Sequence, residues 1–199
     1  EYGDLRHGWV QNVAVLDDQG RRAVVSLNSG LVCLLDLAEG SVEWENQVAF
    51  PELSDRVDMW LTPDVTGDGL PEILVNKGYV SEAVETSTAS NGVTSIRRPL
   101  RIAALLSGAD GSEIWETQLY LTGSAVARVD GHPVLLELHP QAGIRLVNLK
   151  DGQPLTSLNI ASLSGQVSKI EPMSDGSYLL YTKDGNLAAV SPPGEVKWS

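Results

Sequence analysis

Cysteine is almost absent from this chain of 199 residues, and the one thiol, Cys33, has no partner for an internal disulfide. Cys33 stands in the apolar run Leu31–Leu35, so we expect a buried, inert thiol. No apolar run exceeds five residues, far short of the roughly 20 that a membrane-spanning helix needs. The sequence therefore predicts neither a disulfide framework nor a transmembrane segment within these residues.

Basic side chains are also scarce. The chain has 14 Lys and Arg against 26 Asp and Glu, a net charge of −12 and an isoelectric point near 4.5. Because binding to nucleic acid requires a basic face that neutralises phosphates, this composition excludes a nucleic-acid-binding function. An anionic membrane surface is disfavoured for the same reason.

Motifs of nucleophilic, phosphate-binding and redox sites are missing. There is no Gly-x-Ser-x-Gly, no phosphate-binding loop and no Cys-x-x-Cys. His132 and His139 flank one predicted strand, and their odd spacing puts them on opposite faces, which makes a poor metal pair. We therefore expect no catalytic residues and no enzyme activity.

Short aliphatic segments bounded by Gly, Asp, Asn, Ser or Pro fill the sequence, without an amphipathic helix of about ten residues. They are residues 13–16, 23–27, 31–37, 73–75, 102–106, 134–138, 144–149, 178–181 and 187–190. This pattern predicts an all-β fold.

Four segments repeat a strand, a tight turn centred on glycine and a second strand. The aligned glycines are Gly40, Gly111, Gly152 and Gly194, at spacings of 71, 41 and 42 residues. Four residues after the glycine stand Trp44, Trp115, Thr156 and Trp198. A period near 40 residues with four short strands is typical of β-propeller blades, with the tryptophans packed between neighbouring blades.

The repeat predicts one propeller domain over residues 1–199, with blades at about 9–50, 57–120, 121–164 and 165–199. The extra length of the second blade comes from an acidic loop around residues 64–72 and a polar stretch at 81–99. Residues 81–99 lack a strand pattern over most of their length, so we expect an insertion there. It is either a mobile hairpin tip or a partner-binding loop.

The run from Leu35 to Trp44 has an aliphatic strand, Asp36, Gly40 and then tryptophan. It resembles the repeats of the pyrroloquinoline-quinone-type, or quinoprotein dehydrogenase-like, propellers. The resemblance implies a ring of seven or eight blades, of which about four are present. Because no signal peptide is visible and the chain does not begin with Met, it is either a mature protein or a piece of a longer one. The favoured expectation is that remaining blades come from a longer chain; alternatively, residues 1–8 close a four-bladed ring.

The acidic loop places oxygen donors at alternating positions. Asp64, Thr66 and Asp68 stand at positions one, three and five, the Leu70 carbonyl at seven and the Glu72 carboxylate at nine. Oxygen ligands in this register suit a hard cation such as calcium, and the strand that follows at once argues against an EF-hand. The loop resembles the FG-GAP calcium loops of integrin alpha-subunit propellers, although Thr66 and Glu72 depart from the usual Asn/Asp and Asp.

We therefore expect a structural Ca²⁺ at this loop; the alternative is a solvated Asp-Gly turn. Residues 17–20 and 174–176 lack the register of oxygen donors and are expected to form plain turns.

These features predict a non-catalytic interaction scaffold with an unidentified protein partner. We expect it outside the cytoplasm, as a periplasmic or secreted protein or the ectodomain of a membrane protein. One alternative is a fragment of a quinoprotein-type dehydrogenase, although the adjacent cysteine pair that such enzymes often carry is absent. Another is a carbohydrate-binding propeller with Trp9, Trp60 and Tyr79 as sugar platforms, which exposure of these side chains would favour.

Overall fold

The computed structural model describes residues 8–17, 19–48, 57–89, 92–120, 124–129, 131–139, 143–158, 167–191 and 196–198. Side chains are described in these ranges except at 78–101, 158, 196 and 198. The described residues contain strands and turns but no helix, and so no helix able to cross a membrane. The all-β prediction is confirmed.

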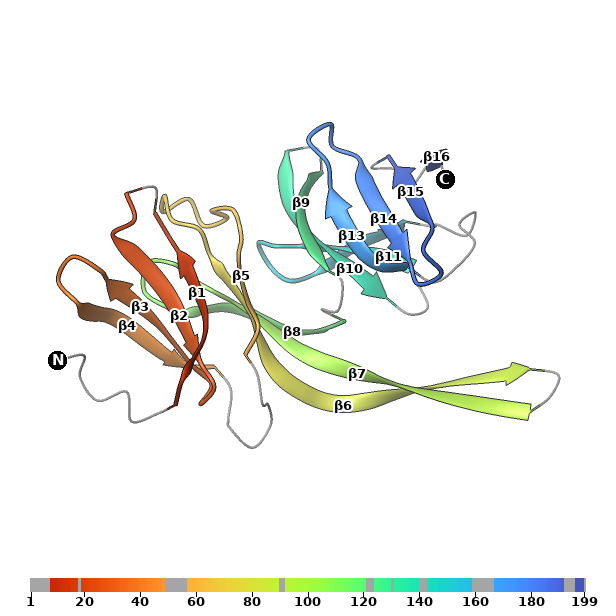
Figure 1. The fold of residues 1–199 in the computed structure, drawn as a ribbon, viewed down its shortest axis with the longest axis horizontal. Coiled ribbons are helices and arrows are strands. Elements are labelled where there is room, and N and C mark those ends of the chain that lie inside the picture. The colour runs from red at the N-terminus through yellow and green to blue at the C-terminus, as the bar shows by residue number, and fades with distance from the viewer. Residues whose placement is uncertain are drawn as a thin grey trace. The chain divides into compact units, whose positions relative to one another are not determined.

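The sixteen strands of the described residues form four antiparallel sheets of four, each following the order of the chain (Figure 1). The first sheet contains β1 (Val10–Val15), β2 (Arg22–Leu27), β3 (Leu31–Asp36) and β4 (Ser41–Gln47). The second contains β5 (Met59–Leu61), β6 (Ile73–Ala89), β7 (Gly92–Leu106) and β8 (Glu113–Leu119). The third contains β9 (Ala125–Val129), β10 (His132–His139), β11 (Gly143–Asn148) and β12 (Pro154–Leu158). The fourth contains β13 (Val167–Pro172), β14 (Tyr178–Thr182), β15 (Leu187–Val190) and β16 (Val196–Trp198).

Four consecutive four-stranded meanders are the blades of a propeller, as the period near 40 residues predicted. The turn between the third and fourth strands has the same geometry in three blades. Gly40, Gly111 and Gly152 have φ of 67°, 71° and 70°, and each donates its N–H to the carbonyl four residues earlier. This left-handed conformation favours glycine, because residues with a side chain rarely adopt it.

A register shift marks a β-bulge near the start of the fourth strand in every blade, and it sets the position of the repeated tryptophan. Register shifts lie between Leu34/Leu35 and at the equivalent pairs of the other three sheets. Directly after each bulge in the fourth strand, the residue four places after the glycine is paired with the third strand. These residues are Trp44, Trp115, Thr156 and Trp198. The sequence repeat is thus a repeat of turn plus bulge.

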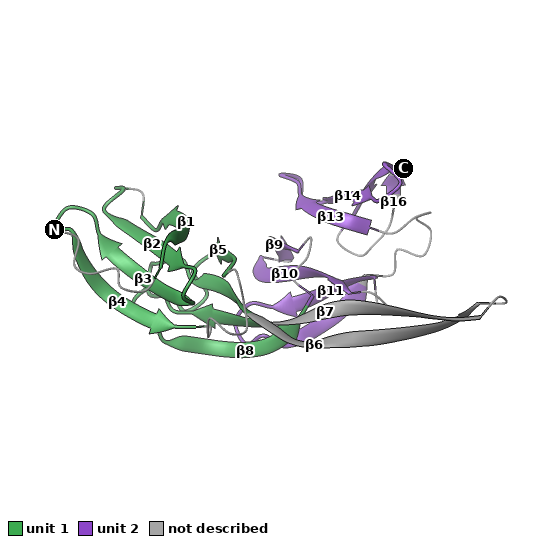
Figure 2. Ribbon diagram, turned by 60° about the horizontal axis from the view of Figure 1, so that its bottom comes forward, with its two compact units in different colours: residues 1–119 green, residues 120–199 purple. Residues whose placement is uncertain are grey.

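The chain divides into two compact units, residues 1–119 and 120–199, each with two sheets and its own core (Figure 2). In the first unit, the core includes Val24 and Leu34 of one sheet with Ile73 and Leu106 of the other. In the second unit, the core includes Leu136, Ile144, Tyr178, Leu180 and Val190. Central strands are apolar almost throughout because both of their faces are covered, whereas β4 is largely exposed.

Residues 81–99 lack a strand pattern in the sequence, yet the structure has strands there. These residues lie within β6 and β7, except for 90 and 91, which are outside the described residues. The two strands pair from Ile73↔Leu106 to Ala89↔Gly92. β5 pairs with β6 only as far as Val75 and β8 with β7 only from Arg101, so this stretch pairs as a two-stranded ribbon. The apolar–polar alternation used to detect strands arises where one face packs on a core, so a ribbon of this kind need not show it.

Candidate functional site

The acidic loop joins β5 to β6, and Thr62 and Glu72 at its two ends continue the hydrogen-bond ladder between these strands. Thr62 donates its backbone N–H to the Glu72 carbonyl at 2.8 Å, and its hydroxyl lies 3.3 Å from the same oxygen. Ile73 then begins β6 directly after Glu72, as the apolar run from residue 73 predicted. The strands therefore fix both ends of residues 63–71, which leaves the interior of the loop to be shaped by its own side chains.

Asp64 organises residues 67–69 of the loop. Its carboxylate accepts the backbone N–H of Gly67 at 2.6 Å and of Gly69 at 2.9 Å. Both glycines have left-handed backbones, with φ of 86° and 89°, which side-chain-bearing residues rarely adopt. The bonds from Gly67 and then Gly69 lower the pKa of Asp64 below its usual value, since they stabilise the charged form.

Glu72 holds residues 65 and 66 of the loop from inside the protein. It is fully buried, and its carboxylate accepts the N–H of Val65 at 2.8 Å and the N–H of Thr66 at 3.0 Å. The Thr66 hydroxyl donates to the same carboxylate at 2.8 Å. A buried carboxylate is tolerated only where hydrogen bonds or an opposite charge compensate it. Among the ion pairs of the described residues, none involves Glu72.

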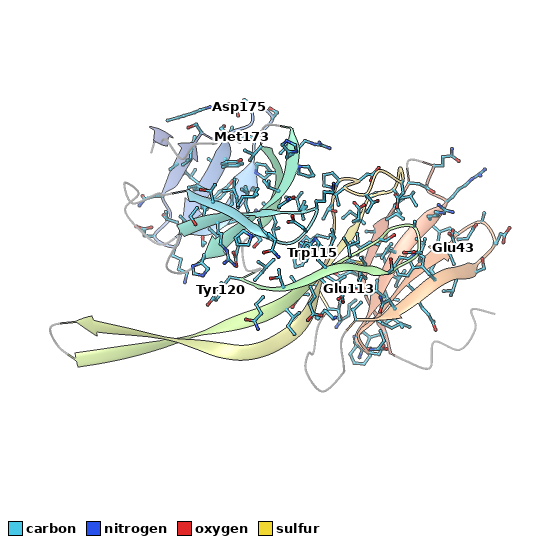
Figure 3. All side chains as sticks on the ribbon, turned by 180° about the vertical axis from the view of Figure 1, so that it is seen from behind. Glu43, Glu113, Trp115, Tyr120, Met173 and Asp175 are labelled. Carbon is cyan, nitrogen blue, oxygen red and sulfur yellow. The ribbon has the colours of Figure 1, made fainter. Side chains whose placement is uncertain are left out.

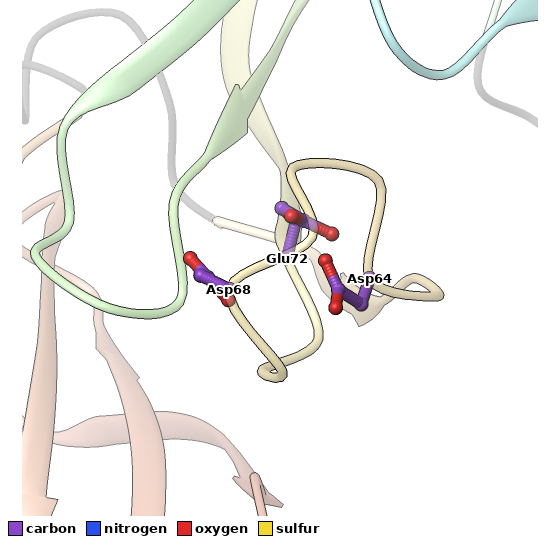
Figure 4. A group of neighbouring side chains, drawn as sticks. All are labelled: Asp64, Asp68 and Glu72. Atoms are coloured by element: carbon purple, nitrogen blue, oxygen red, sulfur yellow. The ribbon is translucent and has the colours of Figure 1, made fainter.

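Three of the predicted ligands come together. Ligand oxygens of Asp64, Asp68 and Glu72 all lie within 4.8 Å of one another, and Glu72 lies between the other two in Figure 4. Two oxygens bound to one calcium at about 2.3–2.6 Å can be at most about 5 Å apart, so the spacing fits this ion. Asp68 accepts the Leu70 N–H at 2.8 Å through one oxygen. The Thr66 hydroxyl is 3.5 Å from Asp64, and a ligand role for it and for the Leu70 carbonyl stays a prediction.

The structure also places the other single residues considered in the sequence, namely Cys33, His132, His139 and Asp175. Cys33 is buried, and its pKa is raised by burial and then by the charge of Glu45. The His139 ring packs edge-to-face on Tyr120 with centroids 5.1 Å apart, while His132 is exposed. Asp175 accepts both the N–H and the hydroxyl of Ser177 in a plain turn, as predicted.

The repeated tryptophans pack against protein. Trp44 packs against the core of the first unit and donates Nε1–H to the Gly108 carbonyl at 3.2 Å. Trp115 on β8 is buried; Figure 3 labels it near Glu113 of the same strand. The prediction that tryptophan packs between neighbouring blades is confirmed for Trp44. The side chain of Trp198 lies outside the described part of the chain.

One buried charged group was missed from the sequence. Glu137 on β10 is fully buried, accepts the Tyr120 N–H at 2.6 Å and forms an ion pair with its cross-strand neighbour Arg145. A signal was present, because Glu137 is the one charge inside the apolar run Val134–Leu138. An isolated charge in a core strand indicates a paired, buried group.

Comparison with known proteins gives distant structural likenesses. No family model matches the chain, and neither does a curated protein. BamB from Moraxella catarrhalis is similar with a TM-score of 0.48 and 17% identity, covering 96% of this chain and 53% of that one. Dihydro-heme d1 dehydrogenase NirN, in complex with DHE, is similar with a TM-score of 0.39 and 17% identity, covering 92% and 45%. The chain thus spans about half the length of these structures, and likenesses this distant carry no argument about its function.

Proposed function

We propose that the chain is a non-catalytic interaction scaffold outside the cytoplasm, stabilised by a calcium ion in loop 64–72. The observation that carries this proposal is the buried carboxylate of Glu72, with ligand oxygens of Asp64 and Asp68 within 4.8 Å. None of the ion pairs of the described residues involves Glu72. Three carboxylates in one short loop repel each other, and a divalent cation would offset that repulsion.

The remaining hydrogen-bonding capacity of the loop supports a hard cation. A carboxylate has about four acceptor positions. Glu72 accepts three hydrogen bonds, and Asp68 accepts one in the described set. Thr66 donates its proton to Glu72, which leaves the oxygen lone pairs of its hydroxyl available for a cation. The donor set would thus be oxygen only, which is what calcium prefers.

The location follows from the affinity that we expect. Thr66 supplies a neutral ligand where related loops have Asn or Asp, and fewer charged ligands weaken calcium binding. Weak sites with Kd of about 10⁻⁴–10⁻³ M belong to extracellular modules. Such a site would fill only outside the cytoplasm.

Thermal unfolding with and without calcium tests the site. Calcium at a hundredfold excess over Kd should stabilise the protein by about 2.7 kcal/mol and raise its Tm, while magnesium substitutes poorly because it demands tighter octahedral geometry. Asp68→Ala should abolish this response without unfolding the protein, because Asp68 is exposed. Asp184→Ala, which changes an exposed aspartate of another Asp-Gly turn, should leave the response intact.

Identical melting curves in calcium and in chelator, with no binding by calorimetry, would reduce the loop to an ordinary Asp-Gly turn.

The absence of enzyme activity has its own test. Addition of pyrroloquinoline quinone and calcium, followed by a dye-linked alcohol or sugar oxidation assay, should give no turnover. Clear turnover would instead support the quinoprotein alternative.

A carbohydrate-binding role is a second candidate, because two of its three predicted platforms are exposed. Trp9 is 72% and Trp60 39% exposed, while the side chain of Tyr79 lies outside the described residues. Exposed indoles offer flat apolar faces for stacking. If sugars bind there, they should alter tryptophan fluorescence, and Trp9→Ala or Trp60→Ala should reduce the change. A fluorescence spectrum unaffected by a panel of oligosaccharides would remove this candidate.

A further inference from the structure

The turn between β7 and β8, residues 107–111, touches the acidic loop on one side. Gly108 leaves no room for a side chain there. A Cβ at Gly108 would lie 2.2 Å from the Pro71 carbonyl oxygen and 3.3 Å from Leu70 Cβ. Leu70 and Pro71 directly precede Glu72, the buried carboxylate of the loop. The loop and the turn are therefore in direct backbone contact.

The same turn touches the neighbouring sheet on its other side. Trp44 of β4 donates Nε1–H to the Gly108 carbonyl at 3.2 Å, and its ring lies against Gly111, where a Cβ would be 2.4 Å from the indole Cε3. Asn46, two residues further along β4, donates its side-chain N–H to the Gly111 carbonyl at 2.7 Å. The indole thus rests on a backbone segment that also supports the acidic loop.

The turn has little freedom to absorb a displacement on its own. The N–H groups of Ala109 and Asp110 point to the Ser107 hydroxyl at 3.2 and 3.4 Å, and the Gly111 N–H bonds to the Ser107 carbonyl at 2.9 Å. Close-packed protein transmits small shifts rather than absorbing them. A hydrogen bond also weakens steeply when its geometry changes, so the Trp44–Gly108 bond would respond to a shift of Gly108.

We propose that this turn couples the conformation of loop 64–72 to Trp44, so that the contact between the first two sheets depends on the state of the loop. The coupling rests on packing; its regulation by calcium rests on the proposed function above. A calcium ion drawing Asp64, Asp68 and Glu72 together would fix Leu70 and Pro71 against Gly108 and thereby tighten the Trp44 contact. The loop would then control the contact between the first two sheets.

Fluorine NMR of the full chain labelled with 5-fluorotryptophan tests the coupling at the indole itself. Trp44→Phe assigns the Trp44 resonance. In chelator, Glu72→Gln and the milder Asp64→Asn should each move this resonance further than Asp151→Asn does, which changes an exposed turn aspartate in the other unit. The exposed Trp9 should report no such shift, and the retained dispersion of the resonances shows that each variant is folded.

Titration with calcium alone tests the regulation. The Trp44 resonance should move with the same midpoint that calorimetry gives for calcium binding. If calorimetry detects no calcium, the proposed function fails, while a shift in Glu72→Gln or Asp64→Asn still supports the coupling. If calcium binds, or both loop variants are folded, and the Trp44 resonance moves no more than in Asp151→Asn, the coupling is overturned.

Discussion

At the scale of residues, different side chains accept the same kind of hydrogen bond at one position of the turn between the third and fourth strands. The residues four places before Gly40, Gly111 and Gly152 are Asp36, Ser107 and Asn148, and the side chain of each accepts N–H groups inside its turn. Short polar side chains do this because they reach their own backbone two or three residues later. Asp36 has a pKa below its usual value, because the N–H groups of Glu39 and then Ala38 donate to the charged form. These three turns therefore share a side-chain acceptor rather than an amino acid.

Asp175 gives another turn, between β13 and β14, a measurable pH dependence. The hydroxyl and N–H of Ser177, followed by Lys197, lower its pKa from 3.8 to about 2. Because the pKa of the folded state lies below that of the unfolded state, the stabilising contribution is full above about pH 4 and is lost as the pH falls towards 2. We expect the difference in unfolding free energy between the wild type and Asp175→Asn to shrink over that range. Urea denaturation at about pH 6, 4 and 3 measures it, and a constant difference would contradict the assignment.

At the scale of elements, the pair Glu137–Arg145 links β10 to β11 inside the second unit. The two residues are direct cross-strand partners, and Glu137 is fully buried whereas the Arg145 side chain is 25% exposed. Cross-strand pairs are the unit by which a sheet is stabilised. Glu137 also accepts the Tyr120 N–H, so it attaches Tyr120, the first residue of the second unit, to the sheet of β9–β12.

The unequal burial of the pair predicts an unequal cost of breaking it. Arg145→Met would leave a fully buried carboxylate without its counter-ion and should cost about 3–5 kcal/mol of unfolding free energy. The double variant Glu137→Leu/Arg145→Met should recover part of that loss, because it removes the unpaired charge as well. Urea unfolding of both variants is the measurement. A double variant less stable than Arg145→Met would show that the Tyr120 bond matters more than the charge.

At the scale of the whole molecule, the chain consists of two units with separate cores. Val24, Leu34 and Ile73 belong to the core of the first unit, and Leu136 and Leu180 to that of the second. A unit with its own core is able to open locally without the rest of the chain. We therefore describe stability for each unit by itself.

Hydrogen exchange detected by mass spectrometry tests this independence. Leu180→Ala removes a fully buried side chain and should destabilise the second unit by about 2–5 kcal/mol. Amides of β14 and β15 should then exchange faster, while those of β2 and β3 keep their rates. Leu34→Ala serves as the matched control with the reverse expectation. Equal acceleration in both units by either variant would show that they unfold together.

Much of the fold could be predicted because its information is local. Gly40, Gly111 and Gly152 mark a left-handed turn, and the residues around each turn satisfy its hydrogen bonds from within a few positions. The central strands were visible as aliphatic runs, since both of their faces are covered. The first strands of the last three sheets, β5, β9 and β13, were not identified, because they lack such runs.

The candidate site likewise combines features that are local in the sequence with features that depend on the tertiary structure. The register of Asp64, Asp68 and Glu72 is a local property, so the sequence by itself determined which carboxylates could meet. Only the tertiary structure decided that Glu72 is buried, that Trp44 rests on Gly108 and Gly111, and that Glu137 is paired with Arg145. Burial depends on what distant segments place over a residue, and Trp44 lies 64 residues from Gly108. Nearby residues in the sequence determine the hydrogen bonds within a turn. Desolvation and packing, in contrast, arise only when separate sheets have come together.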